Sequence, residues 1–163
     1  MKIYAVILEN GKRYKEWSDL SHITYLLRGA ALEYTKETSI ILKERVDIEK
    51  FFLFKYETYH FHVYKGKISW RCLVTDTEYP LEDAFVLLAS LRIKKDLKEQ
   101  MDNFKPCGEG CSGECPSFEE KTFDSIFKEG ETMDDLVDKS ERLSMSARQF
   151  YKTRNLYPNC SVM

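Results

Sequence analysis

Three groups of residues in this 163-residue chain could carry chemistry, and the clearest lies at the end of the printed sequence. There Cys160 is followed by Ser161, the aliphatic Val162 and Met163. A cysteine, two intervening residues and a final methionine form the acceptor pattern for prenylation, and the methionine favours farnesyl over geranylgeranyl. We therefore expect a prenyltransferase to attach a farnesyl group to Cys160. No other cofactor is expected.

The second group is a run of three cysteines, Cys107, Cys111 and Cys115, in the segment KPCGEGCSGECPS. Three thiols could hold zinc or an iron–sulfur cluster, but this spacing matches neither C-x-x-C zinc pairs nor the usual cluster motifs. Palmitoylation of one of them is another alternative. The glycines and prolines favour a flexible linker over residues 105–116, and the odd total of five cysteines favours reduced thiols.

The third group is the pair His60 and His62, which share one face of a strand because they are two residues apart. Such a pair could bind a metal ion. No carboxylate or cysteine accompanies them at ligand spacing, so we favour two histidines on the sheet surface. No metal site is expected.

The C-terminal third has the spacing of a coiled coil. Steps that alternate between three and four residues reach a largely apolar series, which is typical of a helix that packs against other helices. Glu129 is a charged exception near the middle, and a polar layer of this kind usually fixes register and partners. Ser117 and Glu120 form a capping-box pattern, so we expect one helix over residues 117–157, followed by a tail over 158–163. The expected layers are Phe123, Ile126, Glu129, Met133, Leu136, Ser140, Leu143, Ala147 and Phe150.

The first 104 residues carry the pattern of an α+β domain. Alternating apolar residues predict strands over 2–8, 13–17, 51–64 and 68–75, and the second of these is expected to pair with the first through the Asn10-Gly11 turn. The stretch over 51–64 contains a break that favours two strands. Helical periodicity predicts helices over 22–42 and 82–100. Strands with helices on both faces of an antiparallel sheet form an α+β sandwich.

Composition excludes several classes of function. The formal net charge is −2 and the pI is near 6.0, so we expect no nucleic-acid partner. No apolar run reaches the length that spans a bilayer, and no signal peptide is recognisable. We expect a cytoplasmic protein. A phosphate-binding glycine loop and the G-x-S-x-G motif are both absent from the sequence, so we expect no enzyme.

The residues resemble a known family, the prenylated Ykt-type longin SNAREs of the synaptobrevin-like R-SNARE group. The strongest match is GETMDDLVDKSERL at 130–143, followed by SARQFYK at 146–152 and the Cys-a-a-Met end. Weaker matches lie upstream in HVY at 62–64, in TDTEYP at 75–80 and in the AF-x-LL pattern at 84–88. The order of these matches is the one that the family has.

The resemblance implies a profilin-like longin domain over residues 1–104, followed by a coiled-coil SNARE helix. It further implies a lipid-anchored protein on the cytoplasmic face of Golgi, ER and vesicle membranes. Such a protein mediates vesicle docking and fusion, in ER, Golgi and endosome–vacuole transport, by forming a four-helix bundle with partner Q-SNAREs. The family's longin domain folds back on its coiled-coil segment, and Tyr34 and Phe54 are our candidates for lining that groove.

Three features of this chain depart from the family pattern. Glu129 stands where the family places the central arginine, Asn159 stands where it usually has a second lipidated cysteine, and the linker at 105–116 interrupts the region of the first layers. An alternative is therefore a regulatory or adaptor longin module whose degenerate helix no longer drives fusion.

Overall fold

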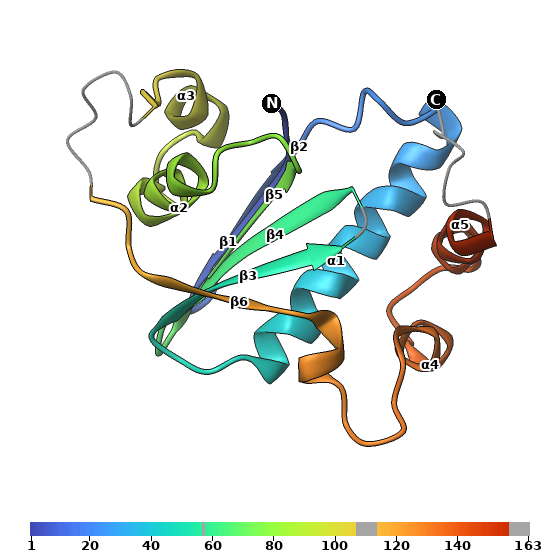
Figure 1. Cartoon of the computed structure of the whole chain (residues 1–163). Helices are drawn as coiled ribbons and strands as arrows, with labels where there is room; N and C mark the ends of the chain where they lie inside the picture. The colour runs from blue at the N-terminus through green and yellow to red at the C-terminus, as the bar shows by residue number, and fades with distance from the viewer. Residues whose placement is uncertain (57, 107–113, 157–163) are drawn as a thin grey trace. The chain divides into compact units, whose positions relative to one another are not determined.

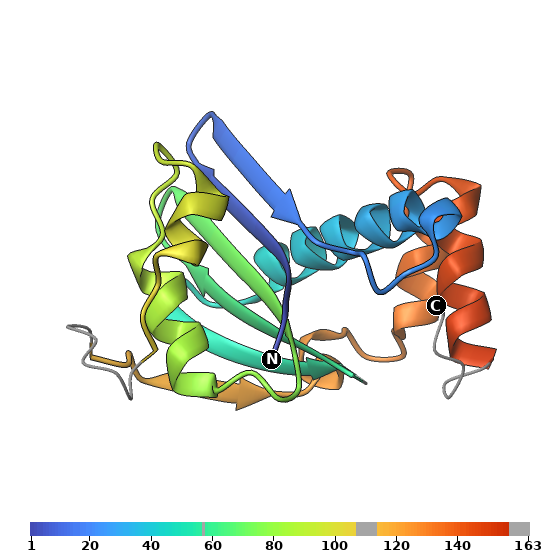
Figure 2. The same ribbon diagram turned by 90° about the horizontal axis from the view of Figure 1, so that it is seen from above.

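The computed structural model describes residues 1–56, 58–106 and 114–156, and the side chains within these ranges up to residue 152. The chain divides into two compact units. The first comprises residues 1–19 and 46–123, and the second comprises residues 20–45 and 124–163. Figures 1 and 2 show the elements of each unit, which are described separately below.

A six-stranded mixed sheet forms the first unit, with strand order β2-β1-β5-β4-β3-β6. All neighbouring strands pair antiparallel except β3 and β6, which pair parallel. The strands are β1 (Ile3–Asn10), β2 (Arg13–Ser18), β3 (Lys50–Tyr56), β4 (Tyr59–Lys65), β5 (Ser69–Asp76) and β6 (Phe118–Lys121).

The strand predictions from alternation are confirmed for the first five strands. The hairpin forms as predicted, but its two turn residues are Gly11 and Lys12, because Asn10 still pairs with Arg13. Gly11 has a φ of 60°, a left-handed conformation that glycine adopts without a steric penalty. The stretch over 51–64 does form two strands, β3 and β4, as the break in its pattern indicated.

Two helices pack on one face of this sheet, where we predicted a single helix over 82–100. The helix α2 (Leu81–Ser90) stops because Leu91 takes an extended conformation, and α3 (Leu97–Asp102) begins afresh at Asp96, whose side chain accepts a hydrogen bond from the Glu99 amide. The core that α2 closes consists of Val6, Leu8, Leu53, Leu73, Ala84, Phe85, Leu87, Leu88, Leu91 and Leu97.

The predicted helix start at Ser117 is wrong. Residues 118–121 form β6, which pairs with β3 from Phe51 to Phe54. The Phe118 ring stacks on Phe85 of α2 with ring centroids 4.2 Å apart. The strand therefore gains both ladder hydrogen bonds and aromatic contact, and these outweigh the local capping-box signal of Ser117 and Glu120.

The second unit contains helices only. It consists of the 3-10 turn η1 (Tyr25–Leu27), the long helix α1 (Arg28–Arg45), the residues of η3 (Phe123–Ile126) after Phe123, and the helices α4 (Met133–Lys139) and α5 (Met145–Leu156). The prediction of one continuous helix over 117–157 is thus wrong for this structure. Gly130, with a φ of 76°, and Ser140, in an extended conformation, separate the pieces.

The two histidines of β4 are buried, so their assignment to the sheet surface is also wrong. His62 is fully buried, its Nε2 lies 3.0 Å from the Thr75 hydroxyl oxygen, and its ring contacts Phe85 edge-on. Burial lowers the pKa of His62 to about 3, so the ring stays neutral at physiological pH. Its role is therefore to pack under α2.

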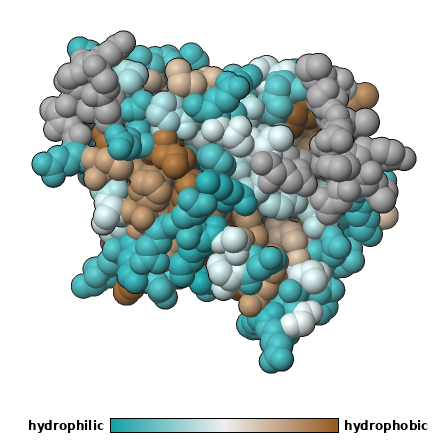
Figure 3. Space-filling model, viewed as in Figure 1, coloured by the Kyte–Doolittle hydropathy of each residue, from teal (hydrophilic) through white to brown (hydrophobic). Residues whose placement is uncertain are grey.

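Among the described residues, no helix is both long enough and apolar enough to cross a membrane. On the face drawn in Figure 3, hydrophilic residues cover most of the surface, and hydrophobic residues form smaller areas between them.

The docking of β6 leads to a prediction about stability. Replacing Phe118 by alanine removes the stacked ring, which is half-buried, and should lower the free energy of unfolding by about 1–2 kcal/mol. The matched control is Glu119→Ala on the same strand. Its exposed pair with Lys50, at 3.6 Å, should contribute less than about 0.5 kcal/mol. Urea unfolding followed by circular dichroism measures both, and equal losses would contradict a packed β6.

Candidate functional site

The segment with coiled-coil spacing is organised by local capping. At the start of α4, the Thr132 hydroxyl accepts a hydrogen bond from the Asp135 amide at 3.3 Å, and the Asp135 carboxylate accepts one from the Thr132 amide at 3.0 Å. This reciprocal pair is a capping box. The Ser144 hydroxyl accepts from the Ala147 amide at 3.2 Å at the start of α5. Both short helices therefore begin at side chains that satisfy free backbone donors.

Helix α5 packs along α1 through aromatic side chains. The Tyr34 ring on α1 lies 6.5 Å from the ring of Phe150 and 5.3 Å from that of Tyr151, measured between centroids. Phe150 and Tyr151 are 6% and 4% exposed, and Ala147 is fully buried. Burial of this kind removes the apolar face of α5 from water without a partner chain.

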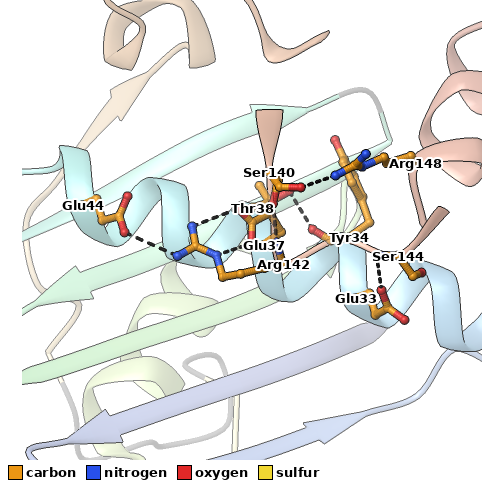
Figure 4. Close-up of polar contacts among 9 residues, drawn as sticks. All are labelled: Glu33, Tyr34, Glu37, Thr38, Glu44, Ser140, Arg142, Ser144 and Arg148. Atoms are coloured by element: carbon orange, nitrogen blue, oxygen red, sulfur yellow. Dashed lines mark hydrogen bonds and ion pairs between the residues drawn. The ribbon is translucent and has the colours of Figure 1, made fainter. Parts of the chain in front are cut away.

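A bidentate ion pair lies beside the aromatic contact. The Arg142 guanidinium donates from Nε to one Glu37 carboxylate oxygen at 2.8 Å and from Nη2 to the other at 3.0 Å, and its Nη1 lies 3.9 Å from Glu44 (Figure 4). Glu37 is only 5% exposed. The hydrogen bonds to Glu37 raise the pKa of Arg142 further above its ordinary value, so the guanidinium stays charged at physiological pH.

Further hydrogen bonds join α1 to the segment that follows Phe123. The Ser144 amide donates to Glu33 of α1 at 3.0 Å (Figure 4). Arg45, the last residue of α1, donates to the Glu131 carboxylate and to the carbonyl of Ile126. The hydrogen bond from Arg45 is the main cause that lowers the pKa of Glu131. Residues after Phe123 therefore contact α1 at positions from Glu33 to its last residue, Arg45.

Most of the predicted layer positions are buried in this arrangement. Ile126 and Leu136 are half-buried and Glu129 is exposed, whereas Val137, which the heptad steps pass over, is 1% exposed. The helix α4 therefore buries Met133, as the heptad seam predicted, but then buries Val137 in place of Leu136. The buried positions of the predicted set are Phe123, Met133, Ser140, Leu143, Ala147 and Phe150.

The two candidate groove residues lie in different units. Tyr34 contacts α5 in the second unit, as described above. Phe54 is fully buried in the first unit, where its ring lies 5.5 Å from that of Phe123. Tyr34 therefore faces part of the coiled-coil segment, and the fold-back groove between the two residues stays a prediction.

Of the reactive side chains, Cys160, Cys107 and Cys111 lie outside the described residues. Cys115 is described and half-buried, and burial raises the pKa of its thiol. Within the described part of the chain, no three histidine, cysteine or acidic side chains form a group that could hold a metal ion.

Sequence reasoning missed Glu37, Arg142 and Tyr151. One signal was available, because Glu33, Glu37 and Glu44 are four and seven residues apart and so lie on one face of α1. An acidic stripe of this kind predicts a basic partner element. Arg142 was hidden because it lies off the heptad seam.

Comparison with known proteins places these features among synaptobrevin relatives, although no protein-family model matches the chain. The chain is 25% identical over 199 aligned residues, covering all of both proteins, to the synaptobrevin homolog YKT6 of Debaryomyces hansenii. It is 27% identical to the VAMP-like protein YKT61 of Arabidopsis thaliana, over 97% of this chain and 90% of that protein. The VAMP-like protein YKT62 of the same plant is 29% identical over 67% of this chain and 68% of its own length.

The similarity and the mixed sheet with its helices together show the α+β, profilin-like longin fold that the sequence predicted. These relatives are a synaptobrevin homolog and two VAMP-like proteins, and the chain is similar to them over most or all of its length.

The bidentate pair generates the prediction for this site. Arg142→Ala leaves the buried Glu37 carboxylate without its bidentate partner, which should weaken the contact of α5 with α1 by about 1–3 kcal/mol. Amide hydrogen exchange over residues 145–152 should then accelerate about fivefold to hundredfold.

The matched control is Lys152→Ala, which removes a cation from α5 itself. The pair of Lys152 with Asp138, at 3.4 Å, joins two side chains that are 56% and 57% exposed, so its removal should change exchange by less than about twofold. Equal acceleration in both variants would show that Arg142 does not hold α5.

Proposed function

From the resemblance to Ykt-type synaptobrevin homologues, we propose that this chain is a lipid-anchored SNARE that mediates vesicle docking and fusion. The observation that carries the proposal is the apolar series from Met133 to Phe150, which has heptad spacing and is covered by contacts within the chain. A helix face of this kind is suited to exchange one helical neighbour for another. We call the state in which α5 packs on α1 the closed form. In it, the acidic groups of α1 and the ring of Tyr34 contact the segment that a partner helix would contact in the bundle.

In the proposed assembly, residues 117–157 form one helix that joins three helices of Q-SNARE partners in a parallel bundle. Apolar layers inside such a bundle are packed like a protein core, and each helix contributes alternate a and d positions. The contact of Phe150 with Tyr34 must break first, because the face of α5 that carries Phe150 would point into the bundle. Folding back against a groove that includes Tyr34 and Phe54 is then the resting state.

Glu129 sets the chemistry of the proposed central layer. A carboxylate accepts hydrogen bonds and donates none, so glutamine partners would have to turn their amide NH2 groups inward. A buried carboxylate that remains under-compensated costs several kcal/mol. We infer that a partner helix with an arginine or lysine at this layer fits best.

For the membrane, we propose attachment through a farnesyl group on Cys160. One lipid chain gives only marginal and reversible binding, and Asn159 provides no second acceptor. The chain would therefore divide between the cytoplasm and the cytoplasmic face of Golgi, ER and vesicle membranes. The basic residues after Glu141 in the sequence, which are Arg142, Arg148, Lys152 and Arg154, would add attraction to anionic lipids.

The test of the proposed function mixes the purified full chain with cognate Q-SNARE helices. A stable four-chain complex that resists SDS is the expected result, and it should form faster with the Arg142→Ala variant because that variant starts more open. Failure of both forms to assemble would favour the alternative, a longin module that binds trafficking partners without driving fusion. The placement of residues 118–121 in the sheet is what favours that alternative.

A substitution at the central layer provides a second prediction. Glu129→Arg should lower the melting temperature of the assembled complex if a partner supplies a cation there, because two buried like charges repel. Glu129→Gln is the control, since it keeps the shape and removes only the charge. Glu129 is exposed in the closed form, so neither variant should change the unfolding of the isolated chain. A complex strengthened by arginine would contradict the proposed cationic partner.

Membrane attachment provides a third prediction. Cys160→Ser removes the thiol that would accept the lipid and should empty the membrane fraction of cells that express the full chain. Fractionation with immunodetection measures the change, and Cys115→Ser is the control. If Cys160→Ser remained on membranes, an anchor other than this farnesyl group would have to supply the attachment.

A further inference from the structure

A basic pocket in the first unit plays no part in the function proposed above. It has a volume of about 370 Å³, and it is formed where the ends of β1 and β5 meet the loop between α2 and α3. The loop contributes Leu91 to Lys95, and the strands contribute Leu8 to Asn10 and Ser69 to Arg71. Four cationic side chains line it, and Glu9 is its one acidic lining residue.

Arg71 is the group that gives this pocket a specific chemistry. Its Nη1 donates to the carbonyls of Leu88 and Ala89 at 2.9 Å each, which caps the C-terminal end of α2. No carboxylate among the described residues pairs with this half-buried guanidinium. Burial and the nearby charge of Arg92 both lower the pKa of Arg71, in that order of importance. The Nε and Nη2 donors remain for an added anion.

Other donors surround Arg71. The guanidinium of Arg92 donates only to the carbonyls of Ala89 and Leu91, and Lys94 has no partner within the described ranges. The ammonium of Lys15 donates to the carbonyl of Lys95 at 2.8 Å, which brings a further cation to the same loop. These charges would repel one another less if an anion lay between them.

Glu9 does not neutralise the pocket. Side chains alternate along a strand, so Glu9 points to the face opposite Leu8, and its cross-strand neighbour is Tyr14 of β2. Arg71 pairs with Leu8 across the β1–β5 ladder and Ser69 pairs with Asn10. Arg71, Ser69 and Asn10 therefore share one face, where a hydroxyl and an amide accompany the cations.

We propose that this pocket binds a phosphorylated polyol headgroup. A phosphate group matches the fork of two N–H donors that Arg71 retains, and the exposed charges of Arg92 and Lys94 suit further phosphates on the same ring. The volume is at the lower end for small-ligand sites, which fits one headgroup. Such a ligand has two sources, a phosphoinositide in a membrane or a free inositol phosphate.

The test uses the full chain without lipid, in the absence of SNARE partners, so its outcome is independent of the proposed assembly. Sedimentation compares phosphatidylcholine vesicles that contain phosphatidylinositol bisphosphate with vesicles that contain phosphatidylserine at equal total charge. Calorimetry with inositol trisphosphate tests the free ligand. We expect bisphosphate vesicles to bind at least about tenfold more tightly than phosphatidylserine vesicles. Calorimetric binding without vesicle binding would identify the free ligand as the source.

Two sets of variants make the test specific. Arg92→Ala combined with Lys94→Ala should weaken binding about tenfold or more, whereas Lys128→Ala combined with Lys139→Ala removes the same charge from exposed sites in the second unit and should change it less than about twofold. Arg71→Lys keeps the charge and the cap but loses the fork, so it should also weaken binding.

Equal binding to both anionic vesicles, equal loss in the two double variants, or no binding to either phosphorylated probe would overturn the proposal. Thermal unfolding of each variant shows whether a loss of binding has come from a loss of folding.

Discussion

The apolar seam of the C-terminal segment has to be kept out of water before any partner is bound, and α1 meets this requirement. Tyr34 covers Phe150 and Tyr151, and the Arg142–Glu37 pair fixes the approach of the same segment. The aromatic contacts remove area from water and are not directional. The ion pair contributes direction, because a bidentate guanidinium and carboxylate fit in one geometry only. Together they select one register of α5 on α1.

The covered segment is divided into short helices, and this division has a physical cause. A seven-residue helix such as α4 is marginal in water, since too few hydrogen bonds offset the entropy of nucleation. Its capping box and the burial of Met133 and Val137 compensate. Gly130, which precedes α4, and Ser140, which follows it, are both outside the helical conformation, so the chain bends before and after α4. A straight helix of the same residues would instead need a partner along its whole length.

Local patterns predicted the elements whose stability is local. The β1–β2 hairpin was predicted from Asn10-Gly11, although the turn lies one residue later, at Gly11 and Lys12. The strands β3, β4 and β5 follow from alternation and turn residues. The strand β6 could not be predicted in this way, because its stability comes from pairing with β3 and from Phe85, far away in sequence. The break between α2 and α3 was missed because Leu91 belongs to the apolar series that predicted a continuous helix. Heptad spacing predicted most of the buried positions, but it missed Val137, and spacing alone does not identify the element that covers them.

The packing of α5 on α1 also affects the affinity for partners in the proposed assembly. If the closed form is favoured over the open form by about 2 kcal/mol, only about one molecule in thirty is open at a given moment. A partner that binds the open form alone is then weakened by the same factor, because its apparent dissociation constant scales inversely with the open fraction. Contacts such as Arg142–Glu37 therefore act on assembly without touching the bundle. Their strength sets how much partner is needed, while the layers set which partner fits.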